Sequence, residues 1–451
     1  MAAGARARQE VPPEALGAYS PAANRPDPVA LLQGQSATRV QSLIPVRYGR
    51  MLASPFTFYR GAALLMASDL AGAPHTDLLS QLCGDAHLSN FGAFASPERH
   101  LVFDINDFDE TNPGPFEWDV KRLVTSMEVA GLDRGFAKKD RTEILRSTIE
   151  GYRQVIQALA GQPNLDVWYA AVDVDEVTRQ LQPQMDKQAR KATDKGLSKA
   201  RSRNSLQAAQ KLTRVVDGKR QFIDDPPVIQ RVETILARLD TDASAQIESL
   251  PDAWQQYVNS LQPDRRHLLS EYRYVDAAHK VVGVGSVGTR AWVLLLQGRD
   301  ADDLLLLQLK EAQASVLEAY TQQSAYAQHG ERVVQGQRLL QTASDIFLGW
   351  STHNGIDYYV RQLRDWKASA DIESMDAATL SIYGRICGST LAKAHARAGD
   401  RVSIAAYIGD DGAFDSAMKS FARAYADQNA ADYAALKAAA DSGQVPVDYG
   451  V

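Results

Sequence analysis

Cysteines and long apolar runs are scarce in this chain of 451 residues. Its two cysteines, Cys83 and Cys387, exclude a disulfide framework and fit a reducing compartment. No apolar run approaches the ~20 residues that a membrane-spanning helix needs, and the N-terminus lacks the apolar centre of a secretory signal. These absences predict a cytoplasmic protein without a membrane partner.

An excess of positive charge is also absent. The chain has 49 basic and 55 acidic residues and a formal net charge of -6, which argues against nucleic acid as a partner. One basic stretch, residues 187–203, is interpreted as a solvated helix face, with a patch for phosphate or an acidic partner as the alternative. The length allows two domains or one large domain with two lobes.

Changes in composition and in the spacing of apolar residues divide the chain into five segments. Residues 1–36 are rich in Pro and Ala, and we expect them to be poorly ordered. Residues 37–164 predict a helical lobe that includes an acid-rich stretch, and residues 165–269 a polar helical insertion. Residues 270–365 predict a small β-rich lobe, and residues 366–451 return to helical spacing and complete the helical lobe. The predicted class is therefore α+β, with a small β-rich lobe on a large helical lobe.

Acidic residues are concentrated in two motifs of the first lobe. The motif "CGDAHLSNFG" runs from Cys83 to Gly92, and "LVFDINDFDE" runs from Leu101 to Glu110. Acids this dense repel one another unless a metal ion or nearby Lys and Arg lie among them. The apolar run from Leu101 to Ile105 predicts a strand, so the remaining acids follow a strand end.

The first motif has the spacing of a kinase catalytic loop. Asp85 and Asn90 are five positions apart, the offset of Asp and Asn in H-R-D-x-x-x-x-N. In that chemistry the Asp orients the attacking hydroxyl, and the Asn amide oxygen binds Mg²⁺. A second metal-binding Asp should follow a strand shortly afterwards, and Asp107 is our choice. The alternatives in the same stretch are Asp104 and Asp109.

A glycine-rich motif in the second half of the chain predicts a phosphate-binding flap. Gly283, Gly285 and Gly288 spell G-x-G-x-x-G, which alone is a weak signal. The next residues, "TRAWVLLLQ", are typical of a strand, which favours a turn between antiparallel strands over a dinucleotide-binding turn. The backbone amides around Ser286 and Val287 would then contact phosphates. An ordinary glycine hairpin is the alternative.

The third strand of this region ends in "LLQLKEA". It places Lys310 where a lysine can reach the α- and β-phosphates of a nucleotide from the sheet; an ordinary surface lysine is the alternative. A glutamate commonly pairs with such a lysine. Glu318 and Glu331 are candidates, and Glu311 is too close in the sequence.

Three further residues remain open between a functional and a supporting role. His87 belongs to the candidate catalytic loop, where a hydrogen bond from its ring would brace the backbone. Arg60, in "FYRGAA", and Arg290, after the flap, would either contact phosphate or form structural ion pairs.

The motifs "CGDAHLSNFG", "FDINDFDE", "FEWDVKRL" and "GVGSVGTR" closely resemble a bacterial family of unknown function, DUF2252, over about residues 40–440. They are also similar to the aminoglycoside-phosphotransferase and protein-kinase-like superfamily, whose loop has the form H-G-D-x-H-x-x-N. That resemblance implies a catalytic role for Asp85 and a Mg²⁺-binding role for Asn90 and Asp107. It also implies that Asp119, in "WDVKRL", is a structural acid.

Two departures from the superfamily pattern stand out. Cys83 occupies the position of the first histidine, which affects only a supporting contact. The catalytic loop and the metal-binding Asp also precede the flap and Lys310, whereas kinase-like chains have the opposite order. The resemblance therefore implies a circularly permuted kinase-like fold, which chain termini at the surface permit. Residues 358–367, "YYVRQLRDWK", would lie against adenine.

These features predict an ATP- and Mg²⁺-dependent phosphotransferase that acts on an unknown hydroxyl acceptor, either a small molecule or a protein. The alternatives are a nucleotide-binding pseudokinase, transfer of AMP in place of phosphate, and a metallophosphoesterase. The motif "GDAH" at 84–87 can also begin a two-metal phosphoesterase site. That site needs further ligands, typically an Asn-His pair, and no such pair follows in the sequence.

Overall fold

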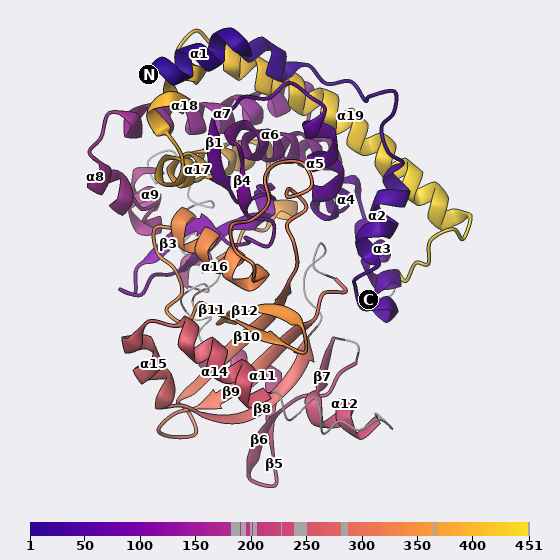
Figure 1. The fold of residues 1–451 in the computed structure, drawn as a ribbon, viewed down its shortest axis with the longest axis vertical. Helices are drawn as coiled ribbons and strands as arrows, with labels where there is room; N and C mark the ends of the chain where they lie inside the picture. Colours follow the sequence, from indigo (N-terminus) through magenta and orange to yellow (C-terminus); the bar gives the residue numbers. More distant parts are fainter. Residues whose placement is uncertain are drawn as a thin grey trace.

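The computed structural model describes residues 1–181, 190, 195–198, 201, 205–226, 228–238, 250–280, 287–363, 366 and 368–449. Within these residues the protein has a mixed α+β fold that is mostly helical and includes a six-stranded antiparallel sheet. Most helices lie in the upper part of Figure 1, and the large sheet lies in the lower part. The predicted α+β class is confirmed.

The helical part is built around three long helices that pack against one another. They are α6 (Phe116–Asp133), α7 (Lys138–Ala160) and α17 (Ala377–Ala398). α6 lies in the middle of the core, and its side chains from Phe116 to Ala130 are buried on all faces. A helix that is buried all round needs neighbours on every side, and shorter helices supply them. These are α3 (Ile44–Met51), α4 (Pro55–Gly61), α5 (Ala63–Ala71), α18 (Arg401–Ile408) and α19 (Ala413–Asp441).

Residues 1–36 differ from the poorly ordered segment that we expected. Arg8 donates from Nη1 to the carbonyl of Tyr407 at 2.7 Å, and Arg25 pairs with Asp69 at 2.6 Å. These contacts are with distant parts of the chain, so the local Pro- and Ala-rich composition gave no sign of them. The segment contains α1 (Ala2–Glu10), the 3-10 turn η1 (Pro13–Gly17) and α2 (Pro28–Ser36).

The large sheet has the strand order β11-β12-β10-β9-β8-β7, and every neighbouring pair is antiparallel. Its central strand, β10 (Leu304–Ala312), begins with four consecutive leucines because both faces of the sheet are covered. Leu304 and Leu306 pack toward α11 (Ser205–Leu212), and Leu305 and Leu307 pack toward α14 (Leu250–Ser260). The remaining strands are β7 (Ile229–Arg231), β8 (Arg273–Lys280), β9 (Ala291–Gln297), β11 (Gly349–His353) and β12 (Ile356–Gln362).

The segment 165–269 contains strands as well as the predicted helices. β7 joins the large sheet, and β5 and β6 form a hairpin. Parts of this segment therefore belong to the sheet region and do not form a purely helical insertion. Much of the basic stretch 187–203 lies outside the described residues. The described elements are α8 (Asn164–Tyr169), α9 (Val174–Leu181), α11 (Ser205–Leu212), β5 (Thr213–Val216), β6 (Lys219–Phe222), α12 (Val232–Arg238), α14 (Leu250–Ser260) and α15 (Pro263–Ser270).

Two small sheets hold the chain around the acidic motifs: β2 and β3 carry motif residues, whereas β1 and β4 flank the two motifs in the sequence. One pairs β1 with β4, and the other has the order β13-β2-β3. β3 covers Leu101–Ile105, the run in which the sequence predicted a strand. The elements here are β1 (Leu79–Leu82), β2 (Phe91–Ala95), β4 (Asn112–Pro115), β13 (Ala368–Ser369) and the turn η5 (Ile372–Ser374).

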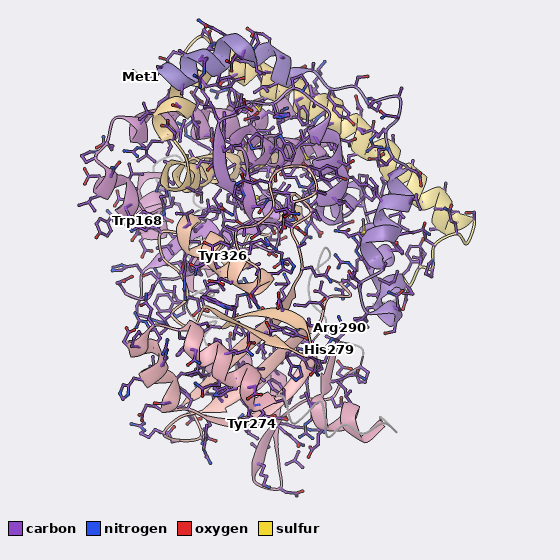
Figure 2. All side chains as sticks on the ribbon, viewed as in Figure 1. Met1, Trp168, Tyr274, His279, Arg290 and Tyr326 are labelled. Carbon is purple, nitrogen blue, oxygen red and sulfur yellow. The ribbon has the colours of Figure 1, made fainter. Side chains whose placement is uncertain are left out.

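The helical end and the sheet end of the molecule are marked in Figure 2 by Met1, which directly precedes α1, and by Tyr274 on β8. α16 (His329–Leu340) follows β10 in the chain and packs on both β12 and α17, so it bridges the two regions. In the described residues, no helix has the length and apolar character to cross a membrane.

Candidate functional site

The loop between β1 and β2 carries the first candidate residues. Gly84 has a φ of +84°, and a Cβ atom there would lie 2.0 Å from the carbonyl oxygen of Glu110, so only glycine fits this turn. Asn90, in the 3-10 turn η3 (Leu88–Asn90), donates from Nδ2 to the carbonyl of Asp85 at 2.7 Å. This hydrogen bond closes the loop and leaves the amide oxygen of Asn90 as the atom that can act as a ligand.

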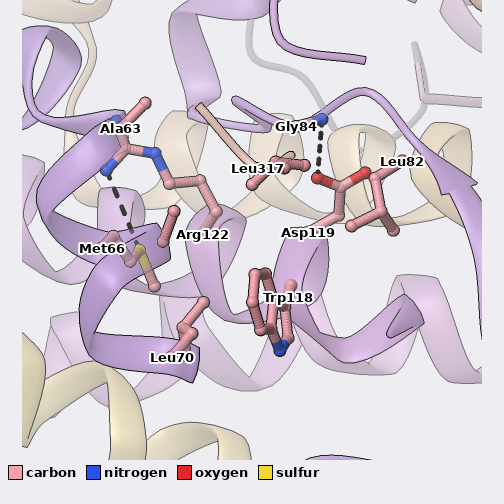
Figure 3. Close-up of a pocket in the computed structure, with 10 residues that line it drawn as sticks. Ala63, Met66, Leu70, Leu82, Gly84, Trp118, Asp119, Arg122 and Leu317 are labelled. Atoms are coloured by element: carbon pink, nitrogen blue, oxygen red, sulfur yellow. Dashed lines mark hydrogen bonds between the residues drawn. The ribbon is translucent and has the colours of Figure 1, made fainter. Parts of the chain in front are cut away.

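A buried acid on α6 shapes the backbone of this loop. The carboxylate of Asp119 accepts hydrogen bonds from the amides of Cys83 at 2.8 Å and Gly84 at 3.1 Å, and the second is drawn in Figure 3. His395 Nε2 lies 3.3 Å from the same carboxylate, and its Nδ1 lies 2.8 Å from the hydroxyl of Tyr152. Asp119 therefore fixes the turn that positions the next residue, Asp85.

Asp85 is held by an arginine on α6. Arg122 donates from Nε to Asp85 Oδ1 at 2.8 Å and from Nη2 to the carbonyl of Tyr59 at 2.6 Å. Burial lowers the pKa of Arg122, but the Asp85 carboxylate, together with Tyr59 and Tyr425, outweighs burial and raises it. The guanidinium therefore stays charged and keeps one oxygen of Asp85 occupied. Arg122 is part of the motif "WDVKRL", but nothing in that motif indicates its contact with Asp85.

His87 lies against Asp85 in the same loop. Its Nε2 is 3.7 Å from Asp85 Oδ2, and its Nδ1 accepts a hydrogen bond from the amide of Ser89 at 3.2 Å. Burial lowers the pKa of His87 to about 4, against the opposing effect of Asp85. The ring is therefore neutral near pH 7, and one nitrogen already braces the loop backbone.

The hairpin of β2 and β3 brings the two acidic motifs together. Phe91 pairs with Ile105, so the residues before β2 and those after β3 lie at the same end of the hairpin. The amide of Asn106 donates to the carbonyl of Asn90 at 2.8 Å. Asp107 therefore follows directly on a residue that is hydrogen-bonded to Asn90.

The three candidate aspartates of the second motif have different surroundings. Asp104 is only 7% exposed and accepts hydrogen bonds from the amides of Ile105 at 2.8 Å and Thr342 at 3.2 Å. Burial raises the pKa of Asp104 to about 6. The side chains of Asp107 and Asp109 are 31% and 28% exposed. Asp104 therefore joins backbone segments, whereas Asp107 and Asp109 remain more accessible.

Lys310, on β10, reaches the two accessible aspartates from the large sheet. Its buried ammonium group forms an ion pair with Asp109 and lies 3.6 Å from Asp107 Oδ2. Tyr359, the partner of Lys310 on β12, donates from its hydroxyl to Asp109 Oδ1 at 2.8 Å. Burial lowers the pKa of Lys310, but the two carboxylates outweigh burial and raise it. Lys310 is therefore the cation that separates these acids.

The glutamates considered as partners of Lys310 lie elsewhere. Glu318 is 3.6 Å from Arg332 on α16, and no ion pair joins Glu331 to Lys310 in the described part of the chain. Arg332 donates from Nη2 to the carbonyl of Asp109 at 2.7 Å. α16 therefore supports the acidic loop through an arginine, and the carboxylates at Lys310 come from that loop.

The glycine-rich turn connects the antiparallel strands β8 and β9, which is the arrangement that the sequence predicted. Val287 and Gly288 at its end are bound to the N-terminal segment. Arg39 donates from Nη1 to the carbonyl of Val287 at 2.7 Å, and the amide of Val40 donates to the carbonyl of Gly288 at 2.8 Å. The remaining flap residues lie outside the described part of the chain: Gly283, Gly285 and Ser286.

Oxygen donors suited to Mg²⁺ are present at this site. In the residues that the structure describes, no group of three or more His, Cys, Asp or Glu side chains is arranged to hold a metal ion. Mg²⁺ that binds together with a nucleotide needs only one or two carboxylates in addition to phosphate oxygens and water. The amide oxygen of Asn90 and the carboxylate of Asp107 are hard oxygen ligands, so the donor set fits Mg²⁺ better than Zn²⁺.

Comparison with protein families shows the family of this chain. A family described as uncharacterized proteins conserved in bacteria, DUF2252, matches residues 39–439. The chain belongs to the DUF2252 family. No curated protein and no solved structure matches it.

In this DUF2252 chain, sequence reasoning missed the residues that join the acidic loop to its surroundings. Arg361, on β12, donates from Nη1 to the carbonyl of Asn106 at 3.0 Å, and Tyr359 binds Asp109. Both lie in "YYVRQL", which was interpreted as a strand beside adenine. The sequence of that strand predicts the strand itself, but it does not predict which loop lies against it.

A small cavity lies next to Asp119 and Arg122, on the α5 side of the loop (Figure 3). Its wall is mostly apolar and includes Met66, Leu70 and Trp118. Neither Lys310 nor Asp107 lines this cavity, so it is distinct from the place where the charged groups meet.

Proposed function

We propose that this DUF2252 protein is an ATP- and Mg²⁺-dependent phosphotransferase with a circularly permuted kinase-like fold. One observation carries the proposal: Lys310 lies with Asp107 and Asp109, next to the loop that holds Asp85 and Asn90. Phosphoryl transfer needs these parts together, namely a lysine for the phosphates, an Asp and an Asn for the metal ion, and an Asp for the attacking hydroxyl.

The phosphate-binding side of the site is assigned to the large sheet. Lys310 would contact the α- and β-phosphates, and the turn that ends at Val287 and Gly288 would cover them. The accessible carboxylate of Asp107 and the amide oxygen of Asn90 would hold Mg²⁺, which would neutralise charge on the phosphates. Asp109 would keep Lys310 in position through their ion pair.

Asp85 is assigned to the acceptor hydroxyl. Arg122 occupies Oδ1, so Oδ2 is the oxygen that can accept a hydrogen bond from a substrate. His87 is a poorer proton acceptor because burial lowers its pKa to about 4 and its Nδ1 already binds Ser89. Catalysis would come mainly from positioning and from neutralising charge.

The chain order is accounted for by permutation. Both ends of the chain contribute to the helical part, because α1 packs on α18 and α2 packs on α19. The large sheet, with the flap and Lys310, lies between these ends in the sequence. A permuted connection of this kind preserves the contacts of a site and changes only the loops that join its elements.

Nucleotide binding with and without metal ion tests the proposal. We expect ATP to raise the midpoint of thermal unfolding only when Mg²⁺ is present, and Asp107→Asn to remove that effect. Asp104→Asn is the matched control, because Asp104 binds backbone amides of the same hairpin. An ATP effect that Asp107→Asn leaves unchanged would remove Asp107 from the metal site.

Label transfer separates the remaining possibilities. Transfer of label from γ-labelled ATP to an acceptor, with ADP as the other product, indicates phosphate transfer. Transfer of label from α-labelled ATP to an acceptor, with release of pyrophosphate, indicates AMP transfer. Binding without turnover indicates a pseudokinase. Stabilisation by Mn²⁺ or Zn²⁺ alone, with no effect of nucleotide, would favour a metallophosphoesterase.

A further inference from the structure

Arg60 and Arg290 are the two arginines that the sequence left open, and they have different surroundings. Arg290, labelled beside His279 in Figure 2, directly precedes β9 and is paired. Its amide and its Nη1 donate to Glu311 Oε2 at 2.9 and 3.0 Å. The Nε of Arg60 is buried and has no hydrogen-bond partner, and no ion pair joins Arg60 to a described residue.

The fold places Arg60 beside the candidate catalytic loop. Arg60 lies in the last turn of α4, directly after Tyr59. The guanidinium of Arg122 binds both the carbonyl of Tyr59 and the carboxylate of Asp85, so one side chain connects the end of α4 to the loop. Burial lowers the pKa of Arg60, whereas the charges of Asp85 and Asp107 oppose that effect.

The other cations around these acids already have partners. Arg122 binds Asp85, Lys310 binds Asp109, and Arg361 binds the carbonyl of Asn106. A guanidinium presents five N–H donors, and burying one of them without an acceptor costs free energy. A ligand that brings its own oxygens would supply the missing acceptors, and a planar guanidinium is well suited to oxyanions.

We propose that Arg60 binds an oxyanion of the phosphate class beside Asp85 and Asp107. The source of this oxyanion is either the terminal phosphate of a nucleotide or an anionic group on the acceptor, and this part rests on the proposed function. In the first case Arg60 contacts the phosphate that is transferred, and in the second it contacts the molecule that receives the phosphate. The first case makes Arg60 a catalytic residue, and the second makes it a determinant of acceptor specificity.

The experiment compares wild type with Arg60→Met and Arg60→Lys by calorimetric titration with ATP, ADP and inorganic phosphate, in the presence of Mg²⁺. Arg146→Met is the control for lost charge, because Arg146 lies on the exposed surface of α7 with Glu143 and Glu150 as its partners. We expect Arg60→Met to bind the relevant oxyanion roughly tenfold to a hundredfold more weakly. Arg60→Lys should recover part of that loss, and Arg146→Met should match wild type.

The ligands for which Arg60→Met loses affinity identify the source of the oxyanion. Weaker binding of ATP with unchanged binding of ADP assigns Arg60 to the terminal phosphate. Unchanged binding of both nucleotides, with loss of phosphate binding to the ATP-loaded protein, assigns it to the acceptor. Equal affinities of wild type and Arg60→Met for ATP, ADP and phosphate would overturn the inference, and so would a wild type that binds none of them.

Two further readouts keep this inference separate from the proposed function and from a structural role. If wild type binds phosphate but no nucleotide, the proposed function fails, whereas loss of phosphate binding in Arg60→Met still supports the oxyanion site. A structural arginine would lower stability when it is replaced. Because the Nε of Arg60 has no partner to lose, we expect Arg60→Met without ligand to be at least as stable as wild type in urea.

Discussion

Lys310 and Asp109 lie 201 positions apart in the sequence, and their side chains form an ion pair where the large sheet meets the acidic loop. Asp107 is the second carboxylate within reach of the same ammonium group, at 3.6 Å. Carboxylates this close disfavour one another's ionisation unless a cation lies between them. Lys310 therefore joins two distant parts of the chain and also stabilises the charge on the loop.

Replacement of Lys310 by methionine should destabilise the protein by roughly 3 kcal/mol, the lower end of the range for breaking a buried ion pair. The lower end applies because Lys310 is only 3% exposed, whereas its partners are 31% and 28% exposed and partly screened by solvent. Urea denaturation measures this loss. Lys437→Met, which removes the exposed pair with Asp441 on α19, should change stability by about 0.5 kcal/mol or less.

A double variant tests whether the loss comes from this ion pair. Lys310→Met combined with Asp109→Asn should be more stable than the sum of the single changes predicts, by about 1–3 kcal/mol, because the second change removes an uncompensated charge. Additive losses would show that Lys310 stabilises the protein through its packing and not through Asp109.

Local features of this site could be predicted from the sequence. The strand at Leu101–Ile105 and the position of Lys310 on β10 follow from the short apolar runs around them. The turn between β8 and β9 follows from glycines between two β-prone runs. Each of these features depends on residues within one or two elements, and periodicity reports such features directly.

Contacts between distant elements could not be predicted in the same way. The pairing of Arg122 with Asp85 requires α6 to pass beside the loop, and the docking of Arg8 on Tyr407 joins opposite ends of the chain. The Pro- and Ala-rich composition of residues 1–36 suggested disorder. Composition contains no information about contacts with distant parts of the chain, and such contacts hold this segment. The sequence offers Glu318 and Glu331 as candidate partners of Lys310, but Asp109 supplies the carboxylate from the acidic loop.

Asp85→Asn should separate nucleotide binding from transfer. We expect the affinity for ATP and Mg²⁺ to stay close to wild type and the turnover of ATP to fall by at least about a hundredfold, because asparagine cannot accept the proton of the acceptor hydroxyl. Equilibrium binding and single-turnover kinetics measure the two effects. Loss of both would indicate that Asp85 acts mainly as the structural partner of Arg122.

His87 should make stability depend on pH below neutrality. Its pKa is about 4 in the folded protein and about 6.5 in the unfolded chain, so the unfolded state binds more protons between these values. Stability from this group is therefore present above pH 6.5 and is lost as pH falls to 4. The full shift corresponds to about 3 kcal/mol.

Comparison with His87→Gln isolates this contribution. Burial raises the pKa of Asp104 to about 6 and of Glu110 to about 7, and these groups give the opposite slope in the same range. Both groups are present in wild type and variant, so the difference between the two stability curves reports His87 alone. Urea denaturation from pH 4 to pH 8 should show the curves diverging below pH 6.5; parallel curves would contradict a buried neutral ring.

Gly84→Ala should disturb the candidate catalytic loop more than an ordinary glycine substitution does. Gly84 has a φ of +84°, and an added Cβ atom would lie 2.0 Å from the carbonyl oxygen of Glu110. Gly135 offers a matched control, because its φ is +69° and no atom lies within 4 Å of a Cβ atom built there. Both variants carry the backbone strain of a positive φ, about 1–3 kcal/mol, but only Gly84→Ala adds a collision.

The collision should therefore appear as a difference between the two variants in urea denaturation. It should also appear in function, because Glu110 follows directly on Asp109 and the amide of Gly84 binds Asp119. A backbone that moves to relieve the contact would displace Asp85 relative to Lys310, so we expect Gly84→Ala to lose ATP turnover while Gly135→Ala keeps it. Equal stability and equal turnover of the two variants would mean that the loop can yield at this contact without moving its acids.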